Sequence, residues 1–422
     1  MSNQFNKEEV VAYEQILEAF NDMQVLSQNV SKYSTDQVTM ERANDTIWRP
    51  QPFIAQSHDG TDATANFDES TQLAVPATIG FHKHSTAIMT ATELRDAMQE
   101  SRLGQAAKQK LASDINVSVM NVAALQGTLF VKRPVAASGF DDVAQCEAIF
   151  NEQGVQGNDR YLALSTRDYN GMASNLASRS TMTGKPTTAY EKAYVGTVAS
   201  FETYKLDYAV RQAAAAGGAG LTISTLDAAV NYYVPRATST ATTGEVSNVD
   251  NRYQTITVSS TTNVAAGDAF TVAALNAVHH ITKGDTGQLK TFRVISVPSA
   301  TTLVISPPMI TDQVSTDATA QYKNCVINTK SATSAIVFLN TVAASVNPFW
   351  QKDAIEILPG RLAVPTDAGA AIMRGTTDQG LELMMTKFFD GNTLKTKFRW
   401  DVRWGVVNKQ PEMSGVMLFS QT

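Results

Sequence analysis

The sequence predicts an α+β protein whose chain is interrupted by an inserted antiparallel β-barrel. Three observations lead to this fold class: a very long amphipathic segment at 90–126, mixed strand and helix patterns on both sides of the middle of the chain, and a β-rich block at 221–330 without helical periodicity. With 422 residues, the chain is longer than one hydrophobic core usually serves, so two or three domains are expected.

The segment from Thr90 to Gln126 is predicted to form one long helix. Thr90 and Glu93 make a capping-box pattern, in which a hydroxyl and a carboxylate satisfy the first free N–H groups. Apolar residues then recur at steps of four and three and share one buried face: Leu103, Ala107, Leu111, Ile115, Val119, Val122 and Leu125. Gly127 supplies the expected stop. Such a helix spans roughly 50 Å and typically lies across a sheet.

A second helix is predicted from Asn6 to Val30. Its first three turns are crowded with acidic residues: Glu8, Glu9, Glu14, Glu18 and Asp22. Acidic side chains near a helix N-terminus suit the helix dipole, and a solvated helix face is the simpler interpretation. The alternative interpretation is an arm that docks on another chain or meets a basic partner.

Between these helices the sequence predicts an extended loop at about 50–84. A strand-like stretch ends at Ile47-Trp48, Pro50 opens an irregular segment, and Gln72 to Ile79 alternates like a returning strand. A loop of roughly thirty residues is rare in a compact domain unless it acts outside that domain. We therefore expect a two-stranded extension whose apolar face is covered by a neighbouring subunit.

Mixed elements follow the long helix and suggest an α+β layer. Strands are predicted at Leu129–Val135, at Tyr161–Ser165 and around a turn within Val195–Tyr208, and helices at Asp141–Gln153 and Thr166–Ser178.

The β-rich block begins after a flexible hinge at Ala213–Gly220. Its short strand-like runs are rich in Thr, Val and Ser: Ala229–Val234, Tyr253–Val258, Ala269–Ala273, Lys290–Val297, Leu303–Ile305 and Gln321–Ile327. This spacing predicts a small antiparallel barrel or sandwich, and a closed barrel is tolerated as an insertion because its ends come together. Helix and mixed patterns are expected to resume at Ser331–Ala344. Three strand-like runs then end the chain: Leu381–Phe389, Lys397–Val407 and Val416–Phe419.

Composition argues against several functional classes. The formal net charge is −6 without a run of Lys and Arg, which argues against a basic nucleic-acid binder, and no apolar stretch reaches the length of a membrane span. The N-terminus lacks the apolar core of a signal peptide. The two cysteines, Cys146 and Cys325, are expected to be free buried thiols of a protein made in a cytoplasm.

Motifs for chemistry are missing from the sequence. It contains no zinc, phosphate-loop, dinucleotide, calcium-loop or serine-hydrolase pattern. His82 and His84 alternate on one side of a predicted strand, but no metal is expected between them. We therefore expect a non-enzymatic protein without catalytic residues, cofactor or metal.

Short stretches along nearly the whole chain resemble one known family. They are Asn44-Asp45-Thr46-Ile47-Trp48-Arg49-Pro50, Glu93-Leu94-Arg95-Asp96, Asn248-Val249-Asp250-Asn251-Arg252-Tyr253, Gly267-Asp268, Phe349-Trp350, Asp353-Ala354-Ile355, Trp404-Gly405-Val406 and Gln421-Thr422. In this order and spacing they resemble the major capsid protein of tailed bacteriophages, with the Hong Kong 97-type fold. The inserted barrel is similar to that of coat proteins from short-tailed Salmonella phages.

The resemblance implies a domain plan and a function. The plan is an N-terminal arm at 1–34, a peripheral domain at 35–49, 85–136 and 386–422, an extended loop at 50–84, an axial domain at 137–220 and 331–385, and an insertion β-barrel at 221–330. The implied function is self-assembly, with a scaffolding protein, into an icosahedral shell of pentamers and hexamers. This shell encloses double-stranded DNA without sequence-specific binding and carries a portal protein at one vertex. The protein would end in the virion after assembly in the bacterial host cytoplasm.

The resemblance also implies roles for individual residues. Glu14 and Glu18 lie where the acidic arm of the family meets the scaffolding protein, and Trp48, Phe67, Arg236 and Glu245 are the expected intersubunit contacts. In the family, a protruding loop of the inserted domain pairs acidic residues across twofold axes. The matching stretch Pro235–Ser247 is Thr- and Ala-rich, with Arg236 and Glu245 as its only charged residues. Polar or apolar packing would therefore replace salt bridges there.

Two other functions fit parts of the sequence. An encapsulin-like compartment shell would keep the fold, but the insertion domain argues against it, and packaged DNA would exclude it. A β-rich binding module or enzyme on a helical scaffold would need a discrete pocket with converging polar groups, for which the sequence offers no candidates.

Overall fold

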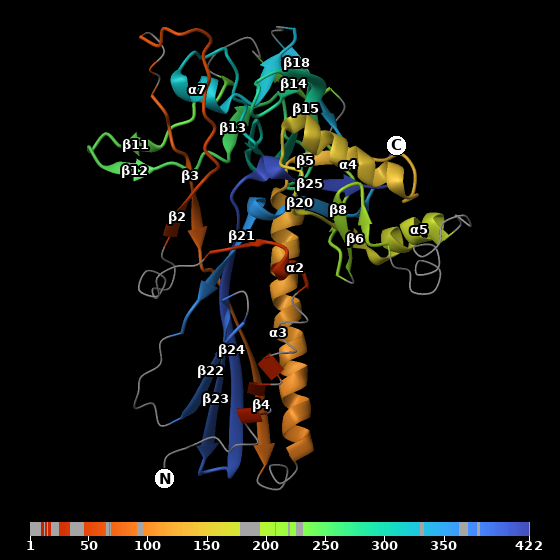
Figure 1. Cartoon of the computed structure of the whole chain (residues 1–422), viewed down its shortest axis with the longest axis vertical. Coiled ribbons are helices and arrows are strands. Elements are labelled where there is room, and N and C mark those ends of the chain that lie inside the picture. Colours follow the sequence, from red (N-terminus) through yellow and green to blue (C-terminus); the bar gives the residue numbers. More distant parts are fainter. Residues whose placement is uncertain are drawn as a thin grey trace. The chain divides into compact units, whose positions relative to one another are not determined.

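The computed structural model describes residues 10–11, 13–14, 16–17, 25–33, 46–64, 67, 69–90, 97–177, 195–206, 208–217, 220–224, 231–329, 333–362, 370–377 and 380–421. The chain forms two compact units (Figure 1). Unit 1 comprises residues 1–47, 77–120 and 355–407, and unit 2 comprises residues 48–76, 121–354 and 408–422. Each unit is built from segments that lie far apart in the sequence.

Unit 1 is built on a six-stranded sheet with the order β1-β21-β24-β23-β22, and β4 also pairs with β24. The strands are β1 (Ser31–Lys32), β4 (Phe81–Thr90), β21 (Ile355–Gly360), β22 (Ala371–Thr376), β23 (Glu382–Asp390) and β24 (Lys395–Asn408). The long strand β24 pairs with β23 along one side and with β4 along the other. The expected strands at 381–389 and 397–407 are therefore confirmed as β23 and β24.

The predicted N-terminal helix is only partly described. Residues 10–11, 13–14 and 16–17 are helical, and α2 spans Val25–Gln28. Tyr13, Ile16 and Leu26 are buried. The Tyr13 hydroxyl donates a hydrogen bond to the Leu383 carbonyl in β23, so the arm segment is fixed to the sheet of unit 1.

The long helix, α3, spans Ala97–Gln126. Its predicted start at Thr90 is wrong, because Thr90 ends β4 and pairs with Lys395; residues 91–96, with the expected cap partner Glu93, lie outside the described residues. The stop after Gln126 is confirmed. A Cβ on Gly127 would lie 2.9 Å from the Ala123 carbonyl oxygen, so close backbone packing requires glycine there.

The buried stripe of α3 is confirmed over most of its length. Ala107, Leu111, Ile115 and Val119 are buried, whereas Leu125 is 48% exposed, and the side chain of Leu103 lies outside the described part. Near the helix C-terminus Ala123 and Ala124 take over the buried face. In unit 1 the buried Trp404 indole donates to Ser118 Oγ at 2.7 Å, which joins β24 to α3.

Unit 2 contains a mixed six-stranded sheet with the order β5-β25-β20-β6-β8-β7. Its strands are β5 (Leu129–Lys132), β6 (Arg160–Ser165), β7 (Thr197–Val198), β8 (Phe201–Leu206), β20 (Asn347–Gln351) and β25 (Ser414–Leu418). Helices α4 (Phe140–Gln153) and α5 (Thr166–Ala177) share a core with this sheet that includes Phe150, Phe201 and Phe349. The short 3-10 turns η3 (Lys352–Ala354) and η4 (Pro411–Met413) lie beside β20 and β25 in the chain. These elements confirm the predicted α+β layer.

The predicted β-barrel is present in unit 2. Its strands are β10 (Thr222–Ser224), β13 (Gln254–Thr257), β14 (Ala269–Val278), β15 (Asp285–Ser299), β16 (Thr302–Ser306), β17 (Cys325–Ile327) and β18 (Thr333–Phe338). They form one sheet with the order β10-β18-β14-β15-β16-β13, with β17 also on β14. A bridge between Ile223 and Val258 joins the two edges, so the sheet closes around a core that includes Phe270, Phe292 and Ile305.

Three expectations for this region are wrong. Residues 333–338 form β18 rather than a helix of the host domain, because Ser334 and Ile336 alternate inward with a period of two. Residues 321–322 end the short helix α7 (Asp317–Tyr322) instead of starting a strand. The run at 229–234 is no strand where it is described, and residues 225–230 lie outside the described part.

A short ladder closes the base of the insertion. Strand β9 (Arg211–Gln212) pairs with β19 (Ala344–Ser345), so that Gln212 lies opposite Ala344. Just inside it, the Ala215 amide donates to the Asn340 carbonyl at 2.7 Å, and Asn340 Nδ2 donates to the Ala213 carbonyl at 3.1 Å. Strand β18 of the barrel sheet and this ladder thus both lie beyond residue 330, where we expected the inserted barrel to end.

The extended loop is two-stranded at its base. Strand β2 (Thr46–Pro50) pairs with β3 (Ala74–Thr78), so the strand expected to end at Trp48 runs on to Pro50. Residues 81–84, which we assigned to the loop, belong to β4 and pair with β24. The alternating residues Leu73, Val75, Ala77 and Ile79 are already buried within the chain. The expectation that a neighbour must cover this apolar face is therefore wrong for the returning limb.

Cys146 and Cys325 are free and buried, as predicted. Among the described residues, no helix combines the length and the apolar character that a bilayer crossing requires.

Candidate assembly surfaces and a buried polar network

Of the two acidic arm residues that we expected to bind a scaffolding protein, the structure describes one. Glu14 lies in the described helical part of the arm and is exposed to solvent, whereas Glu18 lies outside the described residues. An exposed carboxylate next to buried Tyr13 and Ile16 means that this segment holds to unit 1 by its apolar side and presents its acidic side outward. That arrangement suits contact with a positively charged partner.

Among the described residues, the extended loop carries the large hydrophobic side chain with the highest exposed fraction. Phe67 is 86% exposed and Phe53 is 50% exposed. Trp48, which precedes the loop and which we also expected at an interface, is half-buried on β2. An exposed aromatic ring gains from being covered, because fully burying a Phe side chain stabilises by roughly 1.5–3 kcal/mol.

The base of this loop is attached to helix α7 of the same chain. The Thr71 amide donates to Gln321 Oε1 at 3.0 Å, and the Tyr322 hydroxyl donates to the Thr71 carbonyl at 2.7 Å. The Glu69 amide donates to Asp317 Oδ2 at 3.0 Å. Side chains of α7 thus satisfy backbone groups of residues 69 and 71, just before β3 begins.

The outgoing limb of the extended loop also contacts α7. Gln56 Nε2 donates to the Asp317 carbonyl at 3.0 Å. Ile54, from the outgoing limb, packs with Leu73 and Tyr322 in a small apolar cluster. Residues 58–64, beyond these contacts, are exposed, so the free part of the loop is its tip.

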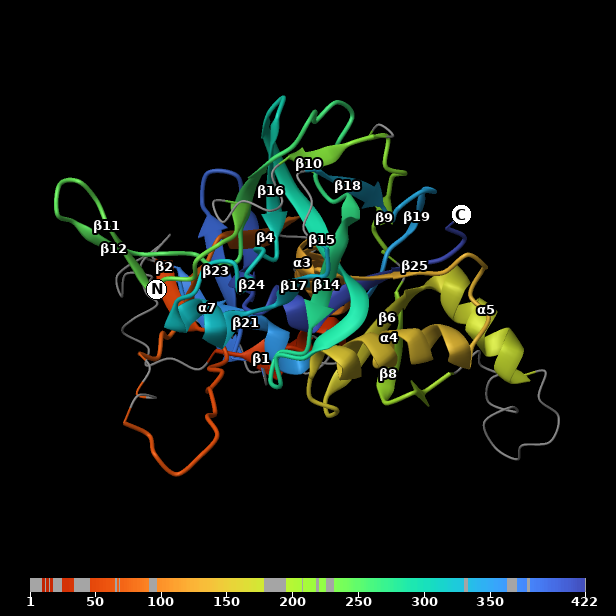
Figure 2. The same ribbon diagram turned by 90° about the horizontal axis from the view of Figure 1, so that it is seen from above.

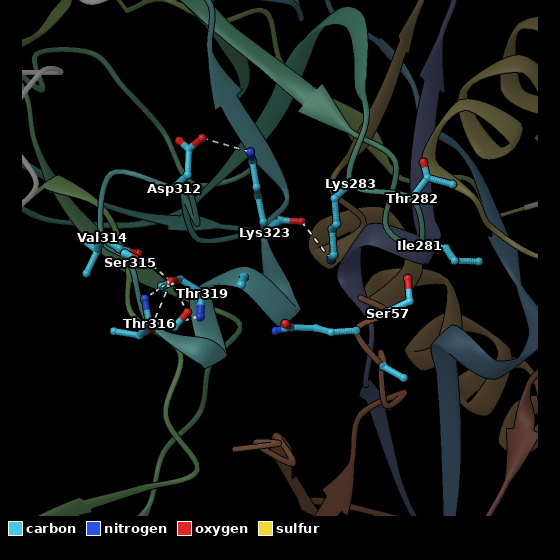
Figure 3. A pocket seen from close by; sticks show the side chains of 13 residues that line it. Ser57, Ile281, Thr282, Lys283, Asp312, Val314, Ser315, Thr316, Thr319 and Lys323 are labelled. Atoms are coloured by element: carbon cyan, nitrogen blue, oxygen red, sulfur yellow. Dashed lines mark hydrogen bonds and ion pairs between the residues drawn. The ribbon is translucent and has the colours of Figure 1, made fainter. Parts of the chain in front are cut away.

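A pocket of about 460 Å³ lies between loop residues 55–57 and the insertion segments around Lys283 and Lys323 (Figure 3). Its polar groups largely satisfy one another: Lys283 Nζ donates to the Lys323 carbonyl, and Lys323 Nζ lies 3.2 Å from Asp312 Oδ2. Burial lowers the pKa of Lys283 to about 8. Both lysines of the described lining and Asp312 are therefore engaged in contacts within the chain.

The protruding stretch at 235–247 forms an exposed hairpin. Strands β11 (Thr238–Thr240) and β12 (Val246–Asn248) pair with each other, and Figure 2 shows the hairpin standing clear of the barrel strands. Both backbone groups of Arg236 bind the Asn251 side chain, at 3.1 and 2.9 Å, which fixes the base of the hairpin. The side chains of Arg236 and Glu245 are exposed, and Val246 is 61% exposed.

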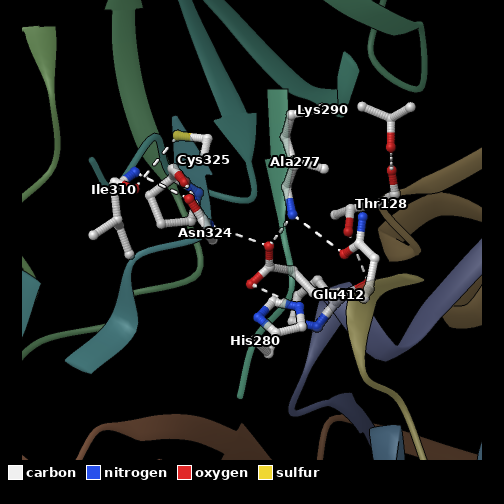
Figure 4. A network of polar contacts seen from close by, with 12 residues as sticks. Thr128, Ala277, His280, Lys290, Ile310, Asn324, Cys325 and Glu412 are labelled. Atoms are coloured by element: carbon white, nitrogen blue, oxygen red, sulfur yellow. Dashed lines mark hydrogen bonds and ion pairs between the residues drawn. The ribbon is translucent and has the colours of Figure 1, made fainter. Parts of the chain in front are cut away.

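The insertion is joined to the rest of unit 2 by a buried polar network (Figure 4). Lys290 in β15, with no exposed surface, forms an ion pair with Glu412 in η4 and also donates to Gln153 Oε1 at the end of α4, at 3.4 Å. Asn324 Nδ2 donates to the same Glu412 oxygen at 3.1 Å. Strand β15, the segment before β17 and η4 are therefore joined at the Glu412 carboxylate, and α4 is joined to them through Lys290.

Charge and burial shift the pKa values in this network. Burial alone would raise the pKa of Glu412, but the charge of Lys290 and the hydrogen bond that Lys290 donates lower it overall. Burial lowers the pKa of His280 to about 4, against the opposing effect of Glu412. His280 is therefore neutral and Glu412 ionised near neutral pH.

Two buried arginines make further connections of the insertion within unit 2. Arg293 Nε donates to the Gly267 carbonyl at 2.9 Å and Nη1 to the Gly127 carbonyl, just after α3, at 3.3 Å; burial lowers its pKa to about 10. Arg252 Nη1 donates to the Asn408 carbonyl at 2.9 Å. A cation at a helix C-terminus is favourable, because the last carbonyls carry partial negative charge.

His82 does not lie in a metal cluster. Its Nε2 lies 3.0 Å from Asp401 Oδ1. The described residues contain no group of three His, Cys, Asp or Glu side chains that could hold a metal ion.

Comparison with known proteins decides which family this architecture represents. A family model described as "P22 coat protein - gene protein 5" matches residues 1–420. The chain belongs to the P22 coat protein family. It is a coat protein of a tailed phage with the Hong Kong 97-type capsid fold, as the sequence resemblance implied.

Solved structures similar to this coat protein include two from phages and one coat protein I-domain. Mycobacterium phage Che8 aligns at 9% identity and a TM-score of 0.45, covering 93% of this chain and 90% of that one. The capsid of cyanophage P-SCSP1u aligns at 11% identity and 0.43, covering 93% and 86%. The CUS-3 coat protein I-domain aligns at 36% identity and 0.20, covering 28% of this coat protein and 94% of that chain. Because these TM-scores are below 0.5, the family membership rests on the match over residues 1–420.

Sequence reasoning missed the residues that hold the coat protein's insertion and loop in place. Lys290, Asn324 and Glu412 are separated by up to 122 positions, and Gln321 and Tyr322 lie about 250 positions from their partner Thr71. A charged residue inside a β-rich run, such as Lys290 in an expected strand, was the one local signal, because a buried lysine requires a partner.

Proposed function

We propose that this coat protein assembles, directed by a scaffolding protein, into a closed icosahedral shell of pentamers and hexamers around the phage's double-stranded DNA. A portal protein occupies one vertex, and the shell forms in the host cytoplasm before it becomes the virion. The family match over residues 1–420 carries this proposal. The division into arm, extended loop, peripheral, axial and insertion domains is part of this proposal, with residues 333–338 assigned to the inserted barrel and residues 81–84 to the peripheral domain.

Exposed apolar side chains support repeated contacts between copies. Besides Phe67 and Val246, the β23–β24 hairpin exposes Phe389 at 49% and Leu394 at 61%, and β4 exposes Ile88 at 58%. Isolated apolar residues are normal on a surface. Here Phe67 and Val246 lie on the extended loop and the protruding hairpin, where the proposal places contacts between subunits, and Phe389, Leu394 and Ile88 add one end of the unit 1 sheet as a further contact surface.

Co-expression with the scaffolding protein of the same phage tests the proposal. Negative-stain electron microscopy is expected to show closed particles of uniform diameter, with DNA in particles from infected cells. Soluble monomers alone, with residues 50–84 intact, would count against shell assembly. Particles that enclose protein cargo and never DNA would favour a compartment shell instead.

The arm is tested separately by charge reversal. Glu14→Lys combined with Glu18→Lys is expected to abolish scaffold-directed particles while leaving the circular dichroism spectrum and thermal midpoint of the monomer unchanged, since Glu14 is exposed. Glu152→Lys, a charge reversal at an exposed position of α4, serves as the control. Normal particles from the double variant would remove the arm from the assembly mechanism.

A further inference from the structure

At three places in the sequence an aspartate or asparagine is followed directly by glycine: Asp59-Gly60, Asn170-Gly171 and Asp390-Gly391. At such a pair the glycine amide nitrogen can attack the side-chain carbonyl carbon of the preceding residue, because glycine has no Cβ to obstruct the approach. The two atoms belong to neighbouring residues, so their reaction depends on whether the fold lets the side chain and the intervening peptide rotate into place. The structure distinguishes the three pairs on this point.

Helix α5 holds the Asn170-Gly171 pair. Both residues lie inside the helix, where backbone hydrogen bonds fix the peptide that would have to rotate. The Asn170 side chain accepts a hydrogen bond from Lys205 Nζ at 3.3 Å. A Cβ on Gly171 would lie 2.9 Å from the Ala137 carbonyl oxygen, so this backbone is also closely packed. The folded protein therefore keeps this pair unreactive.

Hydrogen bonds hold the Asp390-Gly391 pair at the end of β23. Asp390 Oδ2 accepts from Thr393 Oγ1 at 2.9 Å and from Lys397 Nζ at 3.2 Å, and Oδ1 accepts from the Asn392 amide at 3.1 Å. The bond from Thr393, together with those from Lys397 and Asn392, lowers the pKa of Asp390. The carboxylate is thus fixed and ionised, and an ionised carboxylate is a poor electrophile.

The Asp59-Gly60 pair lies at the tip of the extended loop and is not held in this way. Residues 58–64 are all exposed, and none of the described contacts engages the Asp59 carboxylate. No atom lies within 4 Å of a Cβ placed on Gly60, whose φ is +105°. Asp62 in the same tip is different, because its Oδ1 accepts hydrogen bonds from the Thr64 amide at 3.0 Å and from the Thr64 hydroxyl at 2.6 Å.

We propose that Asp59 isomerises to isoaspartate in the unassembled coat protein, with the Gly60 amide nitrogen as the nucleophile. The nitrogen bonds to Asp59 Cγ and loses its proton, one carboxyl oxygen leaves as water, and a succinimide ring forms. Water then adds to the main-chain carbonyl carbon of Asp59, and the bond from this carbon to the nitrogen breaks. Gly60 remains attached through Cγ. Water is lost and regained, and no electron is transferred, so the composition of the chain is unchanged.

The isomerised loop tip is longer by one backbone carbon, the Cβ of Asp59. Both sides of the tip are tied to Asp317 in α7, because Gln56 Nε2 donates to its carbonyl and the Glu69 amide donates to its side chain. A longer connection between two fixed points has to change its path, and this connection carries the exposed Phe67. On the proposed function, on which this step rests, the tip contacts a neighbouring subunit, so isomerised chains are expected to be left out of shells.

Incubation of the folded full-length coat protein at neutral pH tests the isomerisation itself. Isoaspartate is measured by labelling with an isoaspartate-specific methyltransferase and is located by peptide mapping. The label is expected to increase with time in the peptide that contains Asp59, and to stay at its starting level at Asn170 and Asp390. The same protein in urea is expected to react at all three pairs. A folded protein without isoaspartate at position 59, or with equal reaction at position 390, would overturn the proposal.

Two variants separate the local chemistry from general ageing of the protein. Asp59→Glu keeps the charge but would require a larger ring, so it is expected to lose the label at this position. Thr393→Val combined with Lys397→Met removes two of the three hydrogen bonds to Asp390 and is expected to raise isoaspartate at Asp390 above its level in the unchanged protein. Label that persists at position 59 in Asp59→Glu, or no increase at Asp390 in the double variant, would contradict the mechanism.

Assembly of an aged sample with the scaffolding protein tests the consequence for shells. Isoaspartate at position 59 is expected to be enriched in the soluble fraction relative to the purified particles. Equal amounts in both fractions would show that the isomerised tip is tolerated and would overturn this part of the inference. A sample that forms no particles even when fresh would count against the proposed function, while the labelling of the folded monomer would still decide whether Asp59 isomerises.

Discussion

Replacing Tyr322 by Phe is expected to loosen the extended loop from α7 without unfolding the protein. The ring, 9% exposed, remains in its cluster with Leu73, so apolar burial is conserved. The change removes one hydrogen bond, from the Tyr322 hydroxyl to the Thr71 carbonyl at 2.7 Å. Such a bond contributes about 1 kcal/mol. The population in which the loop has left α7 should therefore rise about five-fold.

Amide hydrogen exchange at Thr71 measures this opening. The Thr71 amide keeps its own bond to Gln321 Oε1 in the variant, so faster exchange reports movement of the loop and not the direct loss of that bond. We expect exchange about five-fold faster at this amide and unchanged protection in the barrel strands.

Tyr233→Phe is the matched control. Tyr233 packs against the same cluster, but its hydroxyl binds Asn251 at 3.0 Å and does not touch the loop. Removing the Tyr233 hydroxyl should leave the rate of hydrogen exchange at the Thr71 amide unchanged. Unchanged exchange at Thr71 in Tyr322→Phe, or loss of protection throughout the barrel, would refute the idea that α7 holds the loop independently of the rest of the fold.

Further predictions concern the loop tip, the buried network, the thiols and the core of unit 1. Shortening the exposed loop between Ser57 and Ser70 should leave the monomer folded but weaken shells; a lower unfolding midpoint of the monomer would contradict this. Acidification from pH 7 to pH 4 should lower the free energy of unfolding, measured in urea. His280 has a pKa of about 4 in the folded state and 6.5 in the unfolded state, so the unfolded state binds more protons between pH 7 and pH 4. This difference lowers the free energy of unfolding by about 3 kcal/mol at pH 4. Glu412, whose pKa is lowered in the folded state, loses its contribution below about pH 4.5 and acts in the same direction. Burial raises the pKa of Cys325 to about 12, so this thiol should resist alkylation at pH 8 until the protein is denatured, and rapid native labelling would refute its burial. Trp404→Phe should lower the free energy of unfolding by about 1–3 kcal/mol, because the indole hydrogen bond is buried; an unchanged value would show that this bond contributes nothing net.

Local periodicity accounts for the elements that the sequence predicted correctly. The stripe from Ala107 to Val119, the helices α4 and α5 and most barrel strands depend on side-chain patterns within one element. The wrong start of the long helix has the same local origin. Thr90 and Glu93 form a capping pattern, but Thr90 gains a ladder partner in Lys395, more than 300 positions away. A long-range strand pairing overrides a local cap that contributes only about 1 kcal/mol.

Contacts between distant segments explain what the sequence did not reveal. The returning limb of the extended loop looked unfinished because Thr71, just before β3, is held by the side chains of Gln321 and Tyr322, about 250 positions away. Likewise Lys290 carries no local sign of Glu412, its partner near the other end of the chain. No window of neighbouring residues contains both members of such a pair, so periodicity cannot predict them.

The ladder between β9 and β19 makes the barrel a module that could be exchanged for another. Gln212 and Ala344 face each other across it, so the chain leaves the host fold and returns to it through adjoining backbone positions, roughly 5 Å apart. A foreign module whose two ends lie equally close could be spliced there while the neighbouring sheet keeps its register. The rest of unit 2 would then have to fold without the hydrogen bonds and ion pair that Lys290, Arg293 and Arg252 provide, and the extended loop without its contacts to α7. Such a graft would therefore show how far the stability of the coat protein depends on the barrel.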